Sequence, residues 1–133
     1  MTTMAQDRKL SAPTVYPDNE AFWKAAGEGR LLVKYCADCK QHHWFPRTLC
    51  PFCFSDRTEW RTASGKGTVY TFTVTRRAGP IPFCIAYVTL DEGPSMMTNI
   101  VDVDADTLRI GQRVAVRFQP SDGGPPLPVF VPV

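Results

Sequence analysis

Two Cys-x-x-Cys pairs are the residues of this chain whose type and spacing most directly imply chemistry. The pairs are Cys36 with Cys39 and Cys50 with Cys53, and ten residues separate them. Each pair fits a tight knuckle that directs two thiolates at one point, and two knuckles supply the four sulfur ligands of a tetrahedral zinc or iron ion. Because four thiolates leave no coordination position for water or substrate, we expect one zinc ion with a structural role.

Disulfides and a redox site are the alternatives for these cysteines. Disulfides require an oxidising compartment, but residues 1–9 lack the apolar run of a signal peptide. No stretch approaches the ~18 apolar residues of a membrane helix. We therefore expect a cytoplasmic chain without membrane association, in which the paired cysteines bind metal. A redox Cys-x-x-Cys is the weaker alternative, because it usually occurs as a single pair that opens a helix.

Three further residues are candidate ligands or nucleophiles. His42 and His43 lie between the knuckles, but four cysteines already suffice, so we expect both histidines in a surface loop. Cys84 lies in an apolar segment, 83–88, and is expected to be a small buried core residue. No Ser/His/Asp or Cys/His constellation is visible, so the chain has little with which to perform general acid–base catalysis unaided.

The distribution of charge argues against a dedicated nucleic-acid binder. The net charge is +2; residues 30–61 carry six basic and three acidic groups, whereas residues 62–133 carry six of each. The mild excess therefore lies around the cysteines. A nucleic-acid-binding domain usually concentrates its basic residues on one face.

A single helix is predicted before the first knuckle. Asp18 is a suitable N-cap for a helix over 19–28, and Gly29 can end it. Phe22, Trp23 and Ala26 fall together on one face at helical spacing. Because a helix of about ten residues is marginal alone in water, this face must pack either on its own domain or on a partner. Both alternatives stay open, and Phe22 and Trp23 are candidate partner-docking residues.

The rest of the chain predicts strands. Short strands at 31–35 and 59–61 flank the knuckles and complete a zinc ribbon. Alternation then predicts five longer strands and one capped helical turn. The strands are 69–75, 83–90, 96–103, 113–119 and 129–131, and the turn is 104–108. In the first of these strands, Tyr70, Phe72 and Val74 are expected on one face. This order suits a five-stranded OB barrel, with a small sandwich as the alternative.

The expected fold is therefore mainly β, in three parts. Residues 1–30 form a lead-in, flexible over 1–15, and the N-terminal helix. Residues 31–63 form a rubredoxin-like zinc ribbon. Residues 64–133 form the OB-fold.

The ordered set of motifs resembles a known family. Matching pieces run in family order across about residues 20 to 131: Phe22-Trp23, Gly29-Arg30-Leu31-Leu32, Cys36-x-x-Cys39, Phe45-Pro46-Arg47, Cys50-Pro51-x-Cys53, Gly65-x-Gly67-Thr68-Val69-Tyr70-x-Phe72-Thr73, Leu90-Asp91-Glu92-Gly93-Pro94, Thr98-Asn99 and Ile110-Gly111. The chain resembles the domain-of-unknown-function-35 family, whose members join a rubredoxin-like zinc ribbon to an acyl-CoA-associated OB-fold.

The resemblance implies a function that composition does not. Family members look like non-catalytic accessory subunits of thiolase-fold enzymes, including lipid-transfer-protein-type thiolases or aldolases. The OB part is thought to bind or shield acyl-CoA, and the ribbon and helix look like docking surfaces. We therefore expect a hetero-oligomer with a thiolase-like partner. A hotdog-fold enoyl-CoA hydratase is the alternative partner.

A coenzyme A thioester as ligand requires cations for its phosphates. Arg76 and Arg77, beside the loop 76–82, are the first candidates, and Lys66 between two glycines is a third. Many family members have a longer loop than 76–82, so any cover over CoA is short here.

Two other classes of function compete. OB-folds and zinc ribbons both occur in proteins that bind single-stranded nucleic acid, but the segments 83–90 and 96–103 contain no Lys or Arg. A free-standing acyl-CoA hydrolase or transferase needs a nucleophile, and Cys84 is the only one outside the ribbon that the sequence offers.

Overall fold

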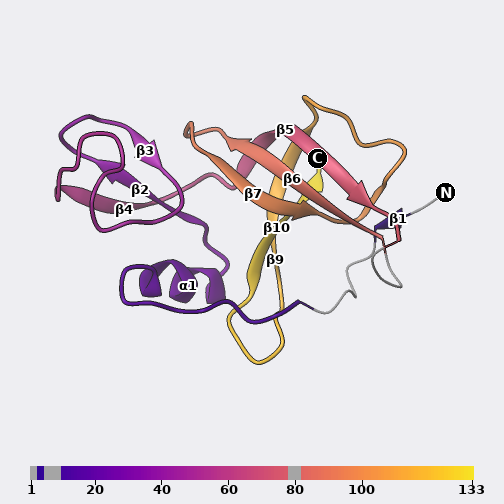
Figure 1. Ribbon diagram of the computed structural model, residues 1–133, viewed down its shortest axis with the longest axis horizontal. Coiled ribbons are helices and arrows are strands. Elements are labelled where there is room, and N and C mark those ends of the chain that lie inside the picture. The colour runs from indigo at the N-terminus through magenta and orange to yellow at the C-terminus, as the bar shows by residue number, and fades with distance from the viewer. Residues whose placement is uncertain (1–2, 5–9, 78–81) are drawn as a thin grey trace.

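A computed structural model describes residues 3–4, 10–77 and 82–133. The three-stranded ribbon lies at one end of the molecule and the barrel at the other, with the helix beside their junction (Figure 1). The ribbon and helix comprise α1 (Glu20–Gly27), β2 (Leu32–Cys36), β3 (His42–His43) and β4 (Thr58–Thr62). The remaining strands are β1 (Thr3–Met4), β5 (Lys66–Thr75), β6 (Phe83–Leu90), β7 (Ser95–Ile100), β8 (Val103–Asp104), β9 (Arg113–Gln119) and β10 (Leu127–Pro132).

The barrel has the strand order of an OB-fold. It closes in the order β10-β7-β6-β5-β9. Its one parallel contact, Ile100 with Phe130, joins β7 to β10, and its other pairings are antiparallel. The mainly β fold and the barrel are therefore confirmed, and the sandwich is excluded. Asp104 ends β8, which pairs with β1. The capped turn expected at 104–108 follows as a single hydrogen-bonded turn: the Thr107 N–H donates to the Asp104 carbonyl (3.0 Å), and Asp104 Oδ1 accepts from the Asp106 N–H (3.0 Å).

A bulge in β5 changes the expected alternation. The register with β6 shifts between Val69 and Thr71, so Tyr70 is an extra residue on that strand. Val69 is buried, Tyr70 is 68% exposed, and Phe72 and Val74 are half-buried. The prediction that Tyr70 shares one face with Phe72 and Val74 is therefore wrong.

The helix ends as predicted but begins differently. Asp18 does not cap it: Asn19 occupies the N-cap position, and its Oδ1 accepts a hydrogen bond from the Tyr16 N–H (2.7 Å), which lies outside the helix. At the other end, Gly29 has φ +80°, and its N–H donates to the Ala26 carbonyl (3.0 Å). This left-handed residue favours glycine and terminates the helix.

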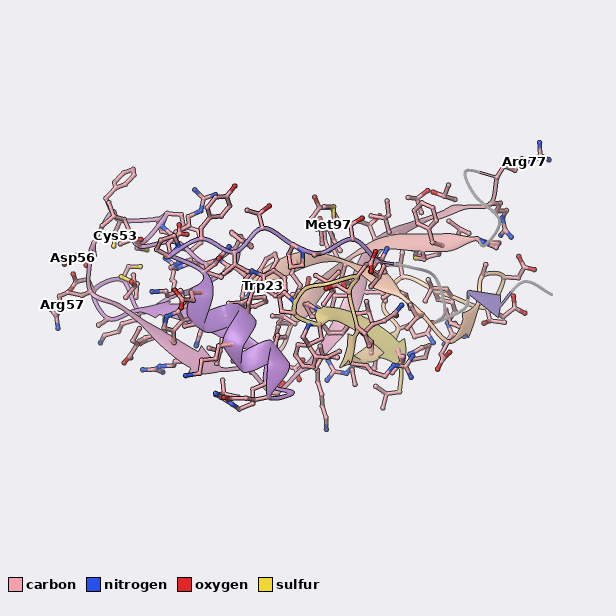
Figure 2. The ribbon with its side chains drawn as sticks, turned by 90° about the horizontal axis from the view of Figure 1, so that it is seen from below. Trp23, Cys53, Asp56, Arg57, Arg77 and Met97 are labelled. Carbon is pink, nitrogen blue, oxygen red and sulfur yellow. The ribbon has the colours of Figure 1, made fainter. Side chains whose placement is uncertain are left out.

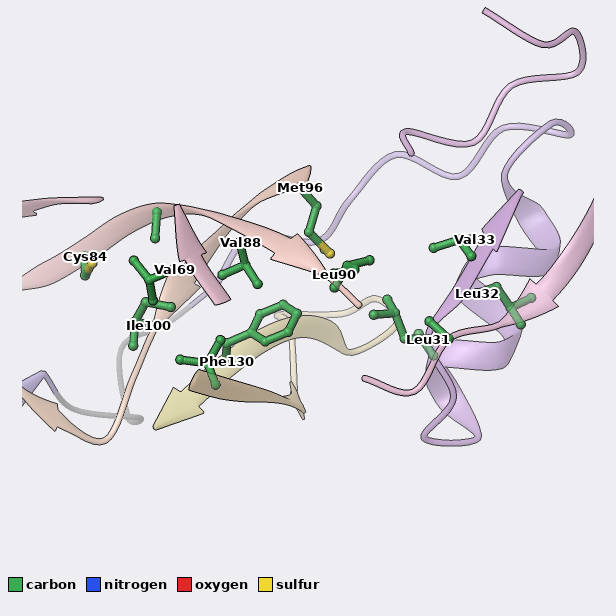
Figure 3. Close-up of a cluster of buried hydrophobic side chains, with 14 of the residues drawn as sticks. Leu31, Leu32, Val33, Val69, Cys84, Val88, Leu90, Met96, Ile100 and Phe130 are labelled. Atoms are coloured by element: carbon green, nitrogen blue, oxygen red, sulfur yellow. The ribbon is translucent and has the colours of Figure 1, made fainter. Parts of the chain in front are cut away.

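One hydrophobic core extends from the barrel into the ribbon and the helix (Figure 3). Phe130 and Val88 are fully buried in the barrel, and Leu31 joins the same cluster from the start of the ribbon. Phe22 and Trp23 belong to this core, at 1% and 9% exposure. The helix face therefore packs on its own chain, which is one of the two destinations expected for it. Docking of a partner by Phe22 and Trp23 stays a prediction.

The N-terminal lead-in is attached to the barrel where it is described. Thr3–Met4 pairs with β8. Leu10 is buried, and its carbonyl accepts a hydrogen bond from Asp122 N–H (2.8 Å). These residues of the expected lead-in over 1–15 therefore contact the OB-fold, and the flexibility of the lead-in stays a prediction; residues 1–2 and 5–9 lie outside the described part. Within the part described, no helix is long and apolar enough to cross a membrane.

Candidate metal centre and the surface beside it

The two knuckles have the same backbone conformation. In the first, the Lys40 N–H donates to the Cys36 carbonyl (2.9 Å); in the second, the Phe54 N–H donates to the Cys50 carbonyl (2.9 Å). Lys40 and Phe54 both have left-handed backbones, with φ of 57° and 63°. The repeated turn places two cysteines of each pair on the same side, as the Cys-x-x-Cys spacing predicts.

The four sulfur atoms converge on one centre. The Sγ atoms of Cys36 and Cys53 lie 3.6 Å apart, as do those of Cys39 and Cys50. All four lie within 4.8 Å of one another. Zinc bound tetrahedrally at Zn–S distances of about 2.3 Å places its sulfurs about 3.8 Å apart, so donor type and spacing fit this ion. Among the described residues, this group includes neither His42 nor His43.

Backbone amides and burial make the thiols unequal. The Cys39 N–H points at Cys36 Sγ (3.5 Å) and, as the main cause, lowers the pKa of the Cys36 thiol to about 7. Burial raises the pKa of the Cys39 thiol to about 12. An N–H donor stabilises a thiolate, whereas desolvation disfavours it. Cys36 is therefore the first of these two thiols to ionise when no metal is bound.

His43 is buried rather than in a surface loop, which corrects the expectation for this residue. It lies on β3 opposite Lys34 of β2 and is 2% exposed. Burial, and then the positive charges of Lys34 and Arg47, lower the pKa of His43, so its ring is neutral at pH 7. His42, its neighbour, is half-buried against the Tyr35 ring, with centroids 4.9 Å apart.

The two modules are held together by the β6–β7 turn. Glu92 Oε2 accepts a hydrogen bond from the Ser64 N–H (2.8 Å), and the Asp91 N–H donates to the Lys66 carbonyl (3.0 Å). Through these two hydrogen bonds, the turn is attached to the segment that connects the ribbon to the barrel. Between this turn and the ribbon lies a cleft of about 470 Å³, which we call the ribbon–barrel cleft; its lining includes Trp44, Phe45, Arg47 and Phe52.

The three candidate phosphate-binding cations do not converge. Lys66 begins β5 and Arg76 follows its end, so about nine extended residues, or roughly 30 Å, lie between them. Arg76 is already paired with Asp106 (3.1 Å). Arg77 is exposed at the end of the molecule opposite Cys53 (Figure 2). Within the loop 76–82, residues 78–81 lie outside the described part.

The outer face of β6 and β7 is apolar. Ile85, Tyr87 and Met97 are exposed there, at 37%, 45% and 58%. Along a strand with one solvated face, apolar inward residues normally alternate with polar outward residues. An outward face that carries large apolar side chains is therefore unusual. A signal for this face is present in the sequence, because both alternating sets of 83–88 are apolar.

Cys84 is a core residue, as expected. It is fully buried, and burial raises the pKa of its thiol to about 11. Such a thiol is protonated at neutral pH and is a poor nucleophile.

Together, the four-cysteine knuckles and the closed barrel define a rubredoxin-like ribbon joined to an OB-fold. Comparison with known families identifies both parts. The profile described as "ChsH2, rubredoxin-like zinc ribbon domain" matches residues 23–59, and that described as "ChsH2, C-terminal OB-fold domain" matches residues 60–119. The chain belongs to this family, DUF35, which confirms the resemblance seen in the sequence.

Several relatives are informative. A DUF35 domain-containing scaffold protein of Pyrococcus furiosus is 35% identical over 100 residues, which cover 70% of this chain and 72% of the relative. A probable enoyl-CoA hydratase alpha subunit of Thermomonospora curvata is 34% identical over 124 residues, or 90% of this chain; the match spans only 39% of that relative. A solved structure entitled "Ltp2-ChsH2(DUF35) aldolase" aligns with a TM-score of 0.79 and 34% identity, covering 90% of this chain and 98% of that one.

Proposed function

We propose that this chain is a non-catalytic accessory subunit of a hetero-oligomeric enzyme that acts on acyl-CoA thioesters, with a thiolase-fold aldolase or thiolase as the catalytic partner. One observation carries the proposal. This chain resembles, in sequence and in fold, a chain of the solved structure entitled "Ltp2-ChsH2(DUF35) aldolase". The resemblance covers nearly the whole length of both chains. The scaffold name of the Pyrococcus relative agrees with an accessory role.

The chemistry of the described residues supports a non-catalytic role. Four thiols directed at one centre leave no open coordination position. The buried thiol of Cys84 has its pKa raised to about 11, and His43 is buried in the ribbon with its pKa lowered. Nucleophilic catalysis needs an activated nucleophile beside a base, and neither residue meets that requirement.

We propose that Cys36, Cys39, Cys50 and Cys53 hold one structural zinc ion. Bound zinc would crosslink the two knuckles and contribute most of the folding free energy of the ribbon. Asp38 of the first knuckle already forms an ion pair with Arg57, just beyond the second, at 2.8 Å. Since both side chains are largely exposed, this pair orients the knuckles and contributes little stability. Free thiols in this number suit a reducing compartment such as the cytoplasm.

Binding or shielding of acyl-CoA is proposed as a property shared with the partner. Lys66 lies too far from Arg76 and Arg77 to hold one phosphate group together with them, so we expect the partner to supply most of the CoA contacts. Lys66 and Arg77 remain the candidates for a contribution from this chain, because neither forms an ion pair within the described residues.

A second candidate partner is an enoyl-CoA hydratase. The Thermomonospora relative bears this name, and a 3-oxo-4,17-pregnadiene-20-carboxyl-CoA hydratase alpha subunit of Mycobacterium tuberculosis is 26% identical over 116 residues. The match covers 39% and 36% of these two proteins. Their hydratase names therefore describe much longer chains.

The test is to purify the tagged chain from the organism that encodes it and to identify co-purifying subunits by mass spectrometry. We expect a stoichiometric thiolase-fold subunit whose turnover of an acyl-CoA falls when this chain is removed. A hydratase subunit in its place would favour the second candidate. Recovery of the chain alone, or acyl-CoA turnover by the chain without any partner, would contradict the proposal.

A further inference from the structure

Three hollows form one continuous strip on the surface. The ribbon–barrel cleft shares Trp44 and Phe45 with a groove of about 220 Å³ beside α1. The groove in turn shares Met97 and Asn99 with a hollow of about 300 Å³ on the outer face of β6 and β7. We call these three hollows together the apolar strip. It runs from the second knuckle across the junction of the two modules and along the barrel.

Exposed apolar side chains follow this strip. Phe52 and Phe45 stand in the cleft at 56% and 41% exposure, and Met97 and Ile85 continue the series on the barrel. Tyr87 lies directly opposite Met97 in the β6–β7 register and so shares its face. Large apolar side chains gathered in this way are typical of a protein interface rather than of a solvated surface.

The strip contains almost no charge. Among its described lining residues, only Arg47 and Glu92 belong to the Lys, Arg, Asp and Glu types. Glu92 is engaged within the chain, because its Oε2 accepts from the Ser64 N–H and its Oε1 is buried. The strip therefore offers no free carboxylate of its own.

Arg47 is an exposed cation that has no ion-pair partner among the described residues. Most arginines of the described part do have one: Arg30, Arg57, Arg61, Arg76, Arg113 and Arg117. Arg47 stands among aromatic side chains in the ribbon–barrel cleft. A guanidinium in such a place is well suited to a bidentate pair with a carboxylate.

We propose that the apolar strip is the surface that binds the partner subunit, and that the partner presents an apolar segment with a carboxylate that pairs with Arg47. The inference rests on the proposed function, which it deepens by locating the interface. Phe52, Phe45, Met97 and Tyr87 are the apolar anchors. Because the strip crosses both modules, the partner holds the ribbon and the barrel in their relative positions.

Other occupants fit the strip less well. A small molecule would fill one hollow and leave the others exposed. A nucleic acid would need several cations, and the strip has Arg47 alone among its described residues. A second copy of this chain would present the same strip, which has no free carboxylate, so Arg47 would face no anion in a symmetric dimer.

The test compares four charge-changing variants of the tagged chain in the purification described above. Met97→Asp and Arg47→Glu alter the strip. Ile110→Asp and Arg109→Glu are matched controls, because both residues are exposed and neither lines the strip. We expect the strip variants to reduce recovery of the partner by about tenfold or more, a usual effect for interface hot spots, and the controls to recover it like the wild type.

A crosslinking experiment separates contact from loss of folding. A photoreactive amino acid at position 97 is expected to crosslink to the partner in the purified complex, and the same amino acid at position 110 is not. Zinc content and thermal unfolding of all variants should match the wild type. Partner recovered equally by wild type, Met97→Asp and Arg47→Glu, with no crosslink from position 97, would overturn the interface and leave the proposed function standing.

Other outcomes would overturn the proposed function or the identity of the molecule that occupies the strip. A wild-type chain that recovers no stoichiometric protein would overturn the proposed function and this inference together. A wild-type dimer on light scattering that Met97→Asp dissociates, or recovered nucleic acid that Arg47→Glu releases, would assign the strip to another occupant.

Discussion

Arg113, at the start of β9, and Asp91, in the β6–β7 turn, form a bidentate ion pair with N–O distances of 2.8 and 2.9 Å. Arg113 also donates to Thr68 Oγ1 of β5 at 3.1 Å. The pair joins three parts of the barrel at the end where Glu92 holds Ser64 of the connecting segment. Both partners are about half exposed, so the pair fixes geometry more than it adds stability.

This pair predicts a specific dependence of stability on pH. The hydrogen bond from Arg113 is the main cause that lowers the pKa of Asp91 in the folded protein. A carboxyl whose folded pKa lies below its unfolded value of about 3.9 stabilises the fold above that value. That stability is lost as the pH falls through the folded pKa. We expect Asp91→Asn to show a shallower fall in thermal stability between about pH 5 and pH 2 than the wild type.

The control for this measurement is Asp56→Asn. Asp56 is exposed and forms no ion pair within the described part of the chain. Its variant should follow the wild-type profile. Superimposable acid limbs for Asp91→Asn and the wild type would show that the pair makes no contribution in solution.

Removal of one ligand should abolish stoichiometric zinc. We expect Cys36→Ala and Cys53→Ser to lose the ion and the folded ribbon, because three thiolates no longer close the tetrahedron. Metal analysis of the purified variants by mass spectrometry measures this directly. Cys84→Ser is the matched control and should keep one zinc per chain. A metal-free Cys36→Ala variant with an intact ribbon would argue against a structural ion.

Thiol reactivity should separate the ligands from the core cysteine. In the metal-loaded protein at pH 8, we expect no rapid reaction of Cys84 with a disulfide reagent, because its thiol is fully buried and has a pKa of about 11. Chelation should release the four ribbon thiols to the reagent, and unfolding should release the fifth. The Cys84→Ser variant should lack only the last phase. Rapid labelling of Cys84 in the native protein would contradict its burial.

The helix should belong to the same cooperative unit as the barrel. Phe22 and Phe130 are fully buried in one cluster, so Phe22→Ala and Phe130→Ala should each lower the free energy of unfolding by about 3–5 kcal/mol. Denaturant unfolding measures this change. Ile110→Ala, at an exposed position, should stay within about 0.5 kcal/mol of the wild type. A separate early transition in Phe22→Ala alone would mean that the helix unfolds independently.

The sequence by itself predicted features that depend on neighbouring residues. The four-sulfur centre follows from two Cys-x-x-Cys spacings, because each knuckle is a local turn. The bounds of β6 and β9 match the predicted segments, because period-two alternation is also local. The OB order followed from the succession of strands, and the family from the order of motifs.

Only the tertiary structure decided features that depend on distant segments. The bulge that exposes Tyr70 arises from pairing with β6, and the burial of His43 arises from pairing with β2. Phe22 packs in a hydrophobic core whose extent could not be predicted from the sequence. The separation of Lys66 from Arg76 was set by the length of β5, and the position of Arg47 beside the β6–β7 turn by the docking of ribbon on barrel. Such relationships depend on how elements far apart in the chain pack together, which local spacing does not specify.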